Sequence, residues 1–153
     1  MPLIRRATAD DAARIGAIAR AAYTKYMPRI GRELPPMLAD FAAEIAADHV
    51  MVIETDGAID GYMIAWREID VYFIDNIAVD PPRQGEGLGR QLIDHAIREA
   101  KHRRSAAIRL YTNAAMTENL SLYTHIGFVE TQRATEKGFH RVYMRLTLPR
   151  GEE

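Results

Sequence analysis

The sequence predicts a mixed α/β domain in which strands and helices are interleaved along the chain. Apolar residues recur at helical spacing in some segments and alternate at strand spacing in others, in the order β α α β β β α β α β β. An Asp56-Gly57 pair between two apolar runs is a hairpin signal. A glycine-rich loop at residues 84–89 separates an apolar strand from a long amphipathic helix.

The first half of the chain opens with a predicted strand at residues 3–6. Thr8 to Asp11 has the spacing of a capping box, so a helix is expected from there to about residue 23. Residues 24–36 contain three prolines and a glycine and predict a loop with a turn of helix. Helical spacing resumes at residues 38–47, and a three-stranded meander follows at residues 50–54, 59–67 and 71–79.

The second half begins with the amphipathic helix, whose apolar face carries Leu88, Leu92 and Ile93. A strand at residues 107–112, a helix near residues 116–125 and two final strands split at Lys137-Gly138 come next. The sequence of 153 residues suits one domain, which we expect at residues 1–148, with a frayed tail at residues 149–153.

Composition narrows the possible partners. With 20 basic and 21 acidic residues, the net charge of -1 predicts neither a nucleic-acid nor a membrane partner. The chain has no cysteine, which excludes disulfides and a cysteine acyl-enzyme. The five histidines have no metal-ligand spacing, so no metal is expected. No signal peptide or long apolar run is present, and the cytoplasm is the expected location.

The glycine loop has the character of a phosphate cradle. Glycines at 85, 87 and 89 remove the Cβ atoms that would block a ligand, and the following helix directs its first N–H groups and its positive dipole end at an anion. The dinucleotide pattern fails because Arg90 occupies the place of its third glycine, and no P-loop pattern occurs. A plain strand-to-helix turn is the structural alternative.

The run from Gln84 to Gly89 matches [QR]-x-x-G-x-[GA] and resembles the acetyl-CoA loop of the GCN5-related N-acetyltransferases, the GNAT family. The block from Asn119 to Phe128 is similar to a second family segment, N-x-x-x-Y-x-x-x-G-F. The resemblance covers essentially the whole chain and is strongest from about residue 74 to 146. It implies a central mixed, mostly antiparallel sheet of about seven strands flanked by about four helices.

The resemblance also implies which residues bind acetyl-CoA, the co-substrate. Backbone N–H groups of the loop would hold the pyrophosphate, with Arg83 or Arg90 adding charge, and the preceding strand would pair with the pantetheine arm. Asn119 would bond to pantetheine, although a helix-start role is also open to it. The implied residues are Ile77, Ala78, Val79, Gln84, Gly85, Glu86, Gly87, Leu88, Gly89, Arg90 and Asn119.

Two catalytic residues are expected. Tyr123 matches the family tyrosine that protonates the CoA sulfur, and the alternative is a tyrosine packed in the core. Asp75 interrupts an otherwise apolar strand face, which predicts a general base, a substrate anchor or a solvent-facing edge position. Many relatives carry a glutamate on the strand that here offers Tyr111, so Glu68 acting through water, and bulk water itself, are further base candidates.

The predicted activity is acetyl transfer from acetyl-CoA to a primary amine, by direct attack in a ternary complex. We favour a small-molecule amine because the near-neutral chain has no obvious docking surface, and a protein or peptide amine is the alternative. Tyr26 and Arg29 lie in the segment that covers the acceptor site in the family. The rivals are a non-catalytic acyl-CoA sensor and a nucleotide-binding regulatory domain. Dimers are frequent in the family, so a homodimer is one expected assembly.

Overall fold

The computed structural model describes residues 1–149, so the frayed tail predicted at residues 149–153 lies outside them except for Pro149. The strands are β1 (Leu3–Arg6), β2 (Val50–Thr55), β3 (Ala58–Arg67), β4 (Val71–Val79), β5 (Ala107–Asn113), β6 (Val129–Glu136) and β7 (Phe139–Thr147). The α-helices are α1 (Ala12–Thr24), α2 (Met27–Ile30), α3 (Phe41–Ala46), α4 (Leu88–His102) and α5 (Thr117–Ile126). Short 3-10 turns are η1 (Ala9–Asp11), η2 (Pro35–Leu38) and η3 (Pro81–Arg83).

The seven strands form one sheet in the order β1-β2-β3-β4-β5-β7-β6. Strands β4 and β5 pair in parallel, whereas β1 with β2, β2 with β3, β5 with β7 and β6 with β7 pair antiparallel. The predicted fold class, a mixed and mostly antiparallel sheet with helices, is therefore confirmed. The single turn α2 falls in the segment where the sequence predicted a loop with a turn of helix.

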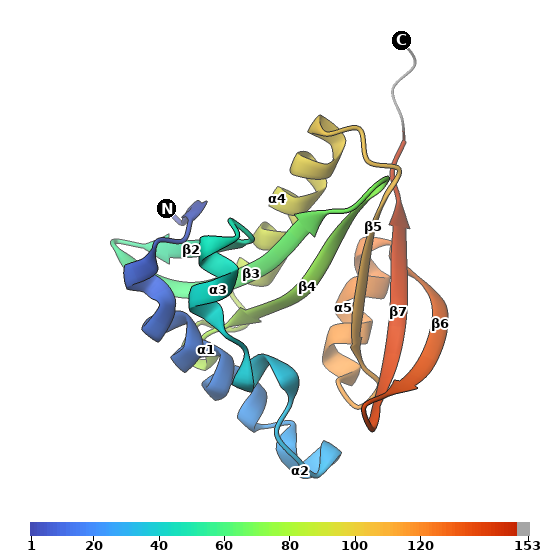
Figure 1. Ribbon diagram of the computed structural model, residues 1–153, viewed down its shortest axis with the longest axis horizontal. Coiled ribbons are helices and arrows are strands. Elements are labelled where there is room, and N and C mark those ends of the chain that lie inside the picture. Colours follow the sequence, from blue (N-terminus) through green and yellow to red (C-terminus); the bar gives the residue numbers. More distant parts are fainter. Residues whose placement is uncertain (150–153) are drawn as a thin grey trace. The chain divides into compact units, whose positions relative to one another are not determined.

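The chain divides into two compact units, and the division passes through β3, β4 and α4. The first unit contains Met1–Ala65 and Asn76–His95. In it, α1 and α3 lie over β2 and β3 (Figure 1). Its core side chains come from α1, β2, β3 and the first half of α4: Ile15, Ile18, Val52, Ile53, Tyr62, Met63, Ile64, Leu92 and Ile93. The ring of Phe41 packs edge-on against Tyr62 with centroids 5.4 Å apart.

The second unit contains Trp66–Asp75 and, within the described residues, 96–149. Helix α5 lies beside β5, β7 and β6 (Figure 1). Burial alternates along β4, β5 and β7, as a sheet with one covered face requires, whereas the edge strand β6 is mostly exposed. The buried members are Tyr72, Ile74, Ile108, Leu110, Val142 and Met144, and the half-buried members of the other face are Phe73, Asp75, Arg109, Tyr111, Arg141 and Tyr143.

Both predicted hairpin turns have the backbone that their residues favour. Asp56 and Gly57 have φ of 52° and 83°, and Lys137 and Gly138 have φ of 52° and 82°. Two successive residues at positive φ are the mark of a type I′ turn, whose twist suits paired strands. These turns join β2 to β3 and β6 to β7.

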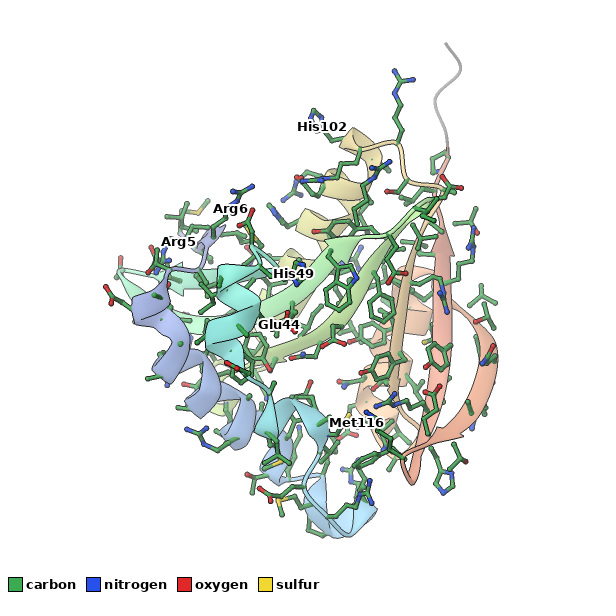
Figure 2. All side chains as sticks on the ribbon, in the orientation of Figure 1. Arg5, Arg6, Glu44, His49, His102 and Met116 are labelled. Carbon is green, nitrogen blue, oxygen red and sulfur yellow. The ribbon has the colours of Figure 1, made fainter. Side chains whose placement is uncertain are left out.

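The helix predicted from residue 38 begins instead at Phe41. The carboxylate of Asp40 accepts a hydrogen bond from the N–H of Ala43 at 3.0 Å and so caps the helix three residues later than expected. At the other end of α3, Glu44 and His49 point toward one another (Figure 2), with Oε1 of Glu44 lying 2.9 Å from Nδ1 of His49.

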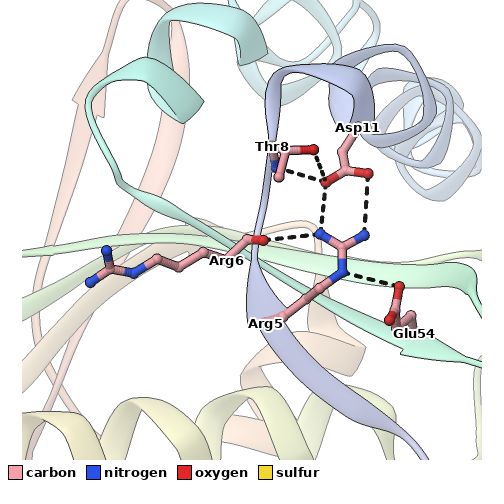
Figure 3. Close-up of polar contacts among 5 residues, drawn as sticks. All are labelled: Arg5, Arg6, Thr8, Asp11 and Glu54. Atoms are coloured by element: carbon pink, nitrogen blue, oxygen red, sulfur yellow. Dashed lines mark hydrogen bonds and ion pairs between the residues drawn. The ribbon is translucent and has the colours of Figure 1, made fainter.

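An ionic cluster ties β1 to β2 and to the start of the first helical segment (Figure 3). The guanidinium of Arg5 lies 2.9 Å from Oδ2 of Asp11 and donates from Nε to Glu54 at 3.1 Å. Asp11 also accepts from the N–H of Thr8 at 2.7 Å, as the predicted capping box requires. The hydrogen bond from Arg5 is the main reason that the pKa of Asp11 is lowered.

No helix within residues 1–149 is both long and apolar enough to cross a membrane.

Candidate active site

The glycine loop between β4 and α4 is an open backbone cradle in the first unit. Gly85 and Gly87 have φ of 85° and 82°, and a Cβ placed on either would meet nothing within 4 Å. The backbone therefore needs glycine for its conformation, and its surroundings leave space for a ligand. The first backbone bond of α4 runs from Gln91 to the carbonyl of Gly87 at 3.0 Å. The N–H groups of Leu88, Gly89 and Arg90 precede that bond at the positive end of the helix dipole, the part of a helix that favours an anion.

Ion pairs hold the loop in place. Nη1 of Arg83 lies 3.0 Å from Oδ2 of Asp60, a carboxylate only 7% exposed, and Nη2 of Arg83 lies 3.1 Å from Glu86. Asp80 forms a second pair with Arg14 at 2.8 Å. The sequence proposed Arg83 as an extra charge for a bound phosphate, but its guanidinium is engaged by two carboxylates of the chain.

The end of β4 is held by side chains from both directions. The hydroxyl of Tyr23 donates to the carbonyl of Ile77 at 3.1 Å, and the amide of Gln84 donates to the carbonyl of Val79 at 3.0 Å. Gly61 of β3 allows the close approach of Ala78, since a Cβ at position 61 would lie 2.8 Å from the Ala78 carbonyl oxygen. This strand end, predicted to pair with an extended ligand, is thus tightly positioned.

Tyr26 and Arg29 lie in and beside the short helix α2. The Tyr26 ring is buried, and the cationic groups of Lys25 and Arg29 each lie 5.1 Å from its centroid. Arg90 lies in the first turn of α4 and pairs with Asp94 one turn later at 3.1 Å.

In the second unit, Asp75 meets Tyr111. The Tyr111 hydroxyl donates to Oδ1 of Asp75 at 3.4 Å. Burial of the phenol, together with the nearby Asp75 carboxylate, raises the pKa of Tyr111 to about 12. The phenol therefore stays protonated at neutral pH and remains a donor to the carboxylate.

Around this pair the half-buried face forms a row of aromatic rings. Ring centroids of Phe73 and Tyr111 are 6.0 Å apart, and those of Tyr111 and Tyr143 are 5.6 Å apart. The guanidinium of Arg141 lies 4.4 Å from the Tyr111 ring centroid and 3.0 Å from Oε1 of Glu136. Trp66 extends the row beside Phe73, and its indole N–H donates to Glu68 at 3.2 Å. The face offers aromatic surface beside charged groups of both signs, a combination that binds amines and their cations.

The predicted helix residues Tyr123 and Asn119 lie on α5. The Tyr123 side chain is buried, with its ring centroid 5.7 Å from that of Phe128. The side-chain amide of Asn119 contacts Sδ of Met116 (Figure 2) at 3.5 Å, at the start of the helix.

Within residues 1–149, no group of three or more potential metal-ligating side chains occurs.

A sequence model of the acetyltransferase (GNAT) domain matches residues 46–130, which include the glycine loop, Asp75, Tyr111 and Tyr123. The matched segment is more than half of the chain. This chain belongs to the GNAT acetyltransferase family.

Sequence relatives of this GNAT domain include two kinds of Escherichia coli K12 enzyme. The [ribosomal protein bS18]-alanine N-acetyltransferase is 36% identical over 75 residues, covering 49% of this chain and 51% of the relative. The L-amino acid N-acyltransferase MnaT is 33% identical over 106 residues, covering 63% of this chain and 59% of the relative. The chain thus spans about half the length of the curated relatives it matches.

Solved structures share the fold at low sequence identity. The Escherichia coli ribosomal-protein-S18-alanine N-acetyltransferase superposes with a TM-score of 0.79 at 24% identity, covering 100% of this chain and 97% of that one. The PaiA N-acetyltransferase of Thermoplasma acidophilum, solved in complex with coenzyme A, superposes with a TM-score of 0.80 at 14% identity. The superposition covers 95% of this chain and 99% of that one. These similarities support the GNAT architecture of the sheet and helices.

The GNAT domain places its predicted residues in two groups. The first unit brings the loop residues together with the end of β4, and the second brings Asp75 together with Tyr111. Sequence reasoning missed Arg141 and Glu136 beside Tyr111, and it missed Lys25 beside the loop. The available signal was strand alternation, but it could not reveal that β7 lies next to β5.

Proposed function

We propose that this GNAT protein transfers the acetyl group of acetyl-CoA to a primary amine by direct attack in a ternary complex. The observation that carries the proposal is the open cradle at Gly85 and Gly87, which leads directly into the N-terminus of α4. Family membership and this geometry point to the same ligand, a pyrophosphate with an attached thioester arm.

The residues present fit acetyl-CoA. Positive φ at Gly85 and Gly87 and the empty space beside their Cα atoms leave the backbone accessible, and the helix end favours negative charge. The N–H groups from Gly85 to Arg90 would hold the pyrophosphate, and Ile77, Ala78 and Val79 would pair with the pantetheine arm. Gln84 and Glu86 would position the loop through Val79 and Arg83. Asn119 is proposed as a further pantetheine contact.

Proton movements are assigned to two residues of the second unit. Bound acetyl-CoA supplies a thioester carbonyl that accepts the amine nitrogen. Asp75 takes the proton that the acceptor ammonium must lose before its nitrogen can attack, and Tyr111 holds that carboxylate through its phenol hydrogen bond. As the C–S bond breaks, Tyr123 donates its phenol proton to the departing thiolate, and the second proton that the nitrogen loses on forming the amide restores the phenol. Glu68 is the second candidate base, because its carboxylate is held by the Trp66 indole.

The acceptor proposed first is a small-molecule amine, the amino group of an amino acid. In the aromatic row, Asp75 bonds to the Tyr111 hydroxyl and Arg141 lies over the Tyr111 ring. This arrangement suits a compact ligand that carries one positive and one negative charge. Similarity to MnaT, named as an L-amino acid N-acyltransferase, supports this choice. A peptide or protein amine is the second candidate, supported by similarity to the enzyme named for alanine of ribosomal protein bS18. We also propose that the protein acts in the cytoplasm and forms a homodimer.

Thermal melting with and without acetyl-CoA tests the cofactor part of this proposal. Ligand binding to the folded state raises the melting temperature of the wild type. Gly87→Asp places a carboxylate in the cradle and removes the rise. The matched control is Gly57→Asp, since Gly57 has φ of 83° and equally open surroundings in the turn between β2 and β3. The control keeps the rise, and a wild type without one would overturn the proposal.

Release of the CoA thiol in the presence of single amino acids and of short peptides tests the acceptor. Turnover with amino acids supports the first candidate, and turnover with peptides alone supports the second. Acetyl-CoA binding without turnover on either set would instead favour the acyl-CoA sensor.

A further inference from the structure

Lys25 contacts the first residue of the glycine loop. It follows the last turn of α1, and its Nζ lies 3.5 Å from Oε1 of Gln84. The Gln84 side chain is oriented by its own donor, because Nε2 bonds to the Val79 carbonyl at 3.0 Å. This bond turns the amide oxygen toward Lys25, so the ammonium lies beside the first residue of the loop.

The arginines around the loop are already neutralised by carboxylates of the chain. Arg83 pairs with Asp60 and Glu86, and Arg90 pairs with Asp94. Arg14, which reaches the start of the loop, pairs with Asp80. None of these guanidinium groups can approach a phosphate without loosening an ion pair that holds the loop or its helix.

Lys25 differs from these arginines in the partners of its charge. Its ammonium contacts an amide oxygen and the face of the Tyr26 ring, both of them neutral, and no carboxylate among residues 1–149 pairs with it. The distance of 3.5 Å to Gln84 is at the outer limit of a hydrogen bond. A phosphate oxygen is a stronger acceptor for an ammonium than an amide oxygen is, because both partners then carry charge.

A purely structural role for Lys25 is the competing explanation. A lysine at a helix C-terminus stabilises the helix dipole, and an ammonium over an aromatic ring gains cation–π energy. Arg29 makes the same contact with Tyr26, at the same 5.1 Å, from α2. A substitution of Arg29 therefore removes a cation from the Tyr26 ring and leaves the Lys25 contact with Gln84 in place, which distinguishes the two explanations.

We infer that Lys25 is a ligand of the pyrophosphate of acetyl-CoA and exchanges the Gln84 amide oxygen for a phosphate oxygen when the nucleotide binds. This inference rests on the proposed function, since it names one more side chain of the same cofactor site. It assigns the positive charge that the sequence had placed on Arg83 or Arg90 to a residue about 60 positions earlier in the chain.

Calorimetric titration of the purified protein with CoA tests the assignment without relying on turnover. Lys25→Met weakens CoA binding about five- to tenfold, as expected for an exposed charge pair with phosphate. Lys25→Arg retains most of the affinity. Arg29→Met, the matched control, changes it less than about twofold, and the thermal melting of each unliganded variant verifies that it is folded.

Dephospho-CoA, which lacks the 3′-phosphate, identifies the phosphate concerned. The loss caused by Lys25→Met is the same for CoA and dephospho-CoA if Lys25 contacts the pyrophosphate. A loss confined to CoA, or equal affinities for wild type and Lys25→Met, would overturn the inference. A wild type that binds neither ligand would overturn the proposed function itself, so the two failures are distinguishable.

Discussion

The hydroxyl of Tyr111 on β5 donates a hydrogen bond to the carboxylate of Asp75 on β4, at 3.4 Å. Burial and the Asp75 charge raise the pKa of this phenol to about 12. At neutral pH the Tyr111 phenol therefore stays protonated and remains the donor to the Asp75 oxygen. The hydrogen bond thus joins the acidic residue that interrupts the apolar face of β4 to a tyrosine on the neighbouring strand β5.

The raised pKa of Tyr111 predicts a loss of stability in alkali. Above pH 10, the unperturbed value, the unfolded chain releases the phenol proton while the folded chain retains it up to about pH 12. The stability due to this phenol is complete below pH 10 and is lost as the pH rises through that window. We expect urea unfolding of Tyr111→Phe to show a shallower decline there than wild type does. Tyr72 and Tyr143 also have raised pKa values, but both are present in wild type and variant and contribute equally to the two curves. Stability that declines equally with pH in the two proteins would therefore contradict the prediction.

Asp75→Asn should reduce acetyl transfer by about 100-fold or more, because an amide cannot take the proton of the acceptor. CoA affinity should change little, which calorimetry can verify. Glu68→Gln is the matched control and should reduce the rate less than about threefold. A large loss in the Glu68 variant with a normal Asp75 variant would transfer the role of base to Glu68.

Tyr123→Phe should lower kcat by about 10- to 100-fold while leaving CoA binding unchanged, because it removes the donated proton and keeps the ring. The ring contact with Phe128 remains in the variant. Tyr72→Phe removes a comparably buried phenol from the same unit and should leave kcat near that of wild type. Steady-state rates that are equal for Tyr123→Phe and wild type would show Tyr123 to be a packing residue.

Gly61→Ala should destabilise the protein by about 1–3 kcal/mol, as overpacking does. The new Cβ would lie 2.8 Å from the Ala78 carbonyl oxygen and 3.2 Å from Cγ2 of Ile53, and neither backbone nor core can move freely. At Gly89 the nearest atom to a Cβ is Cγ2 of Val79 at an ordinary 3.8 Å. Gly89→Ala should therefore be neutral or stabilising by up to about 1 kcal/mol in α4. Chemical denaturation compares the two, and equal effects would contradict the argument.

Arg5→Met should cost about 1–2 kcal/mol, because it leaves two partly buried carboxylates, Asp11 and Glu54, without their shared guanidinium. Arg6→Met is the adjacent control: its pair with Asp48 is 69% and 57% exposed and should contribute less than about 0.5 kcal/mol. The pKa of Asp11 is lowered in the folded state, so the wild-type advantage should fade as the pH falls below 3.8, the unperturbed value. Urea unfolding near neutral pH and in acid measures both effects, and an advantage that persists in acid would argue against the ionic explanation.

Local signals predicted most of the elements. The hairpins at Asp56-Gly57 and Lys137-Gly138 have the positive φ angles that these residue pairs favour. The glycine loop and the helix behind it also lie where the sequence placed them. Helix α3 was expected three residues too early, because apolar spacing did not reveal that the Asp40 side chain caps at Phe41.

By itself, the sequence determined the element order, the open loop at Gly85 and Gly87, and the resemblance to the GNAT family, since each depends on residues that are neighbours along the chain. Tertiary structure alone decided that Tyr111 meets Asp75, that Arg141 lies over the Tyr111 ring, and that Lys25 reaches Gln84. These contacts join residues 30 to 59 positions apart. They depend on which strands pair, on the register of each pair and on where α1 ends against the loop. Backbone preference acts over a few residues and cannot specify such long-range pairing, which is set by packing of the whole sheet.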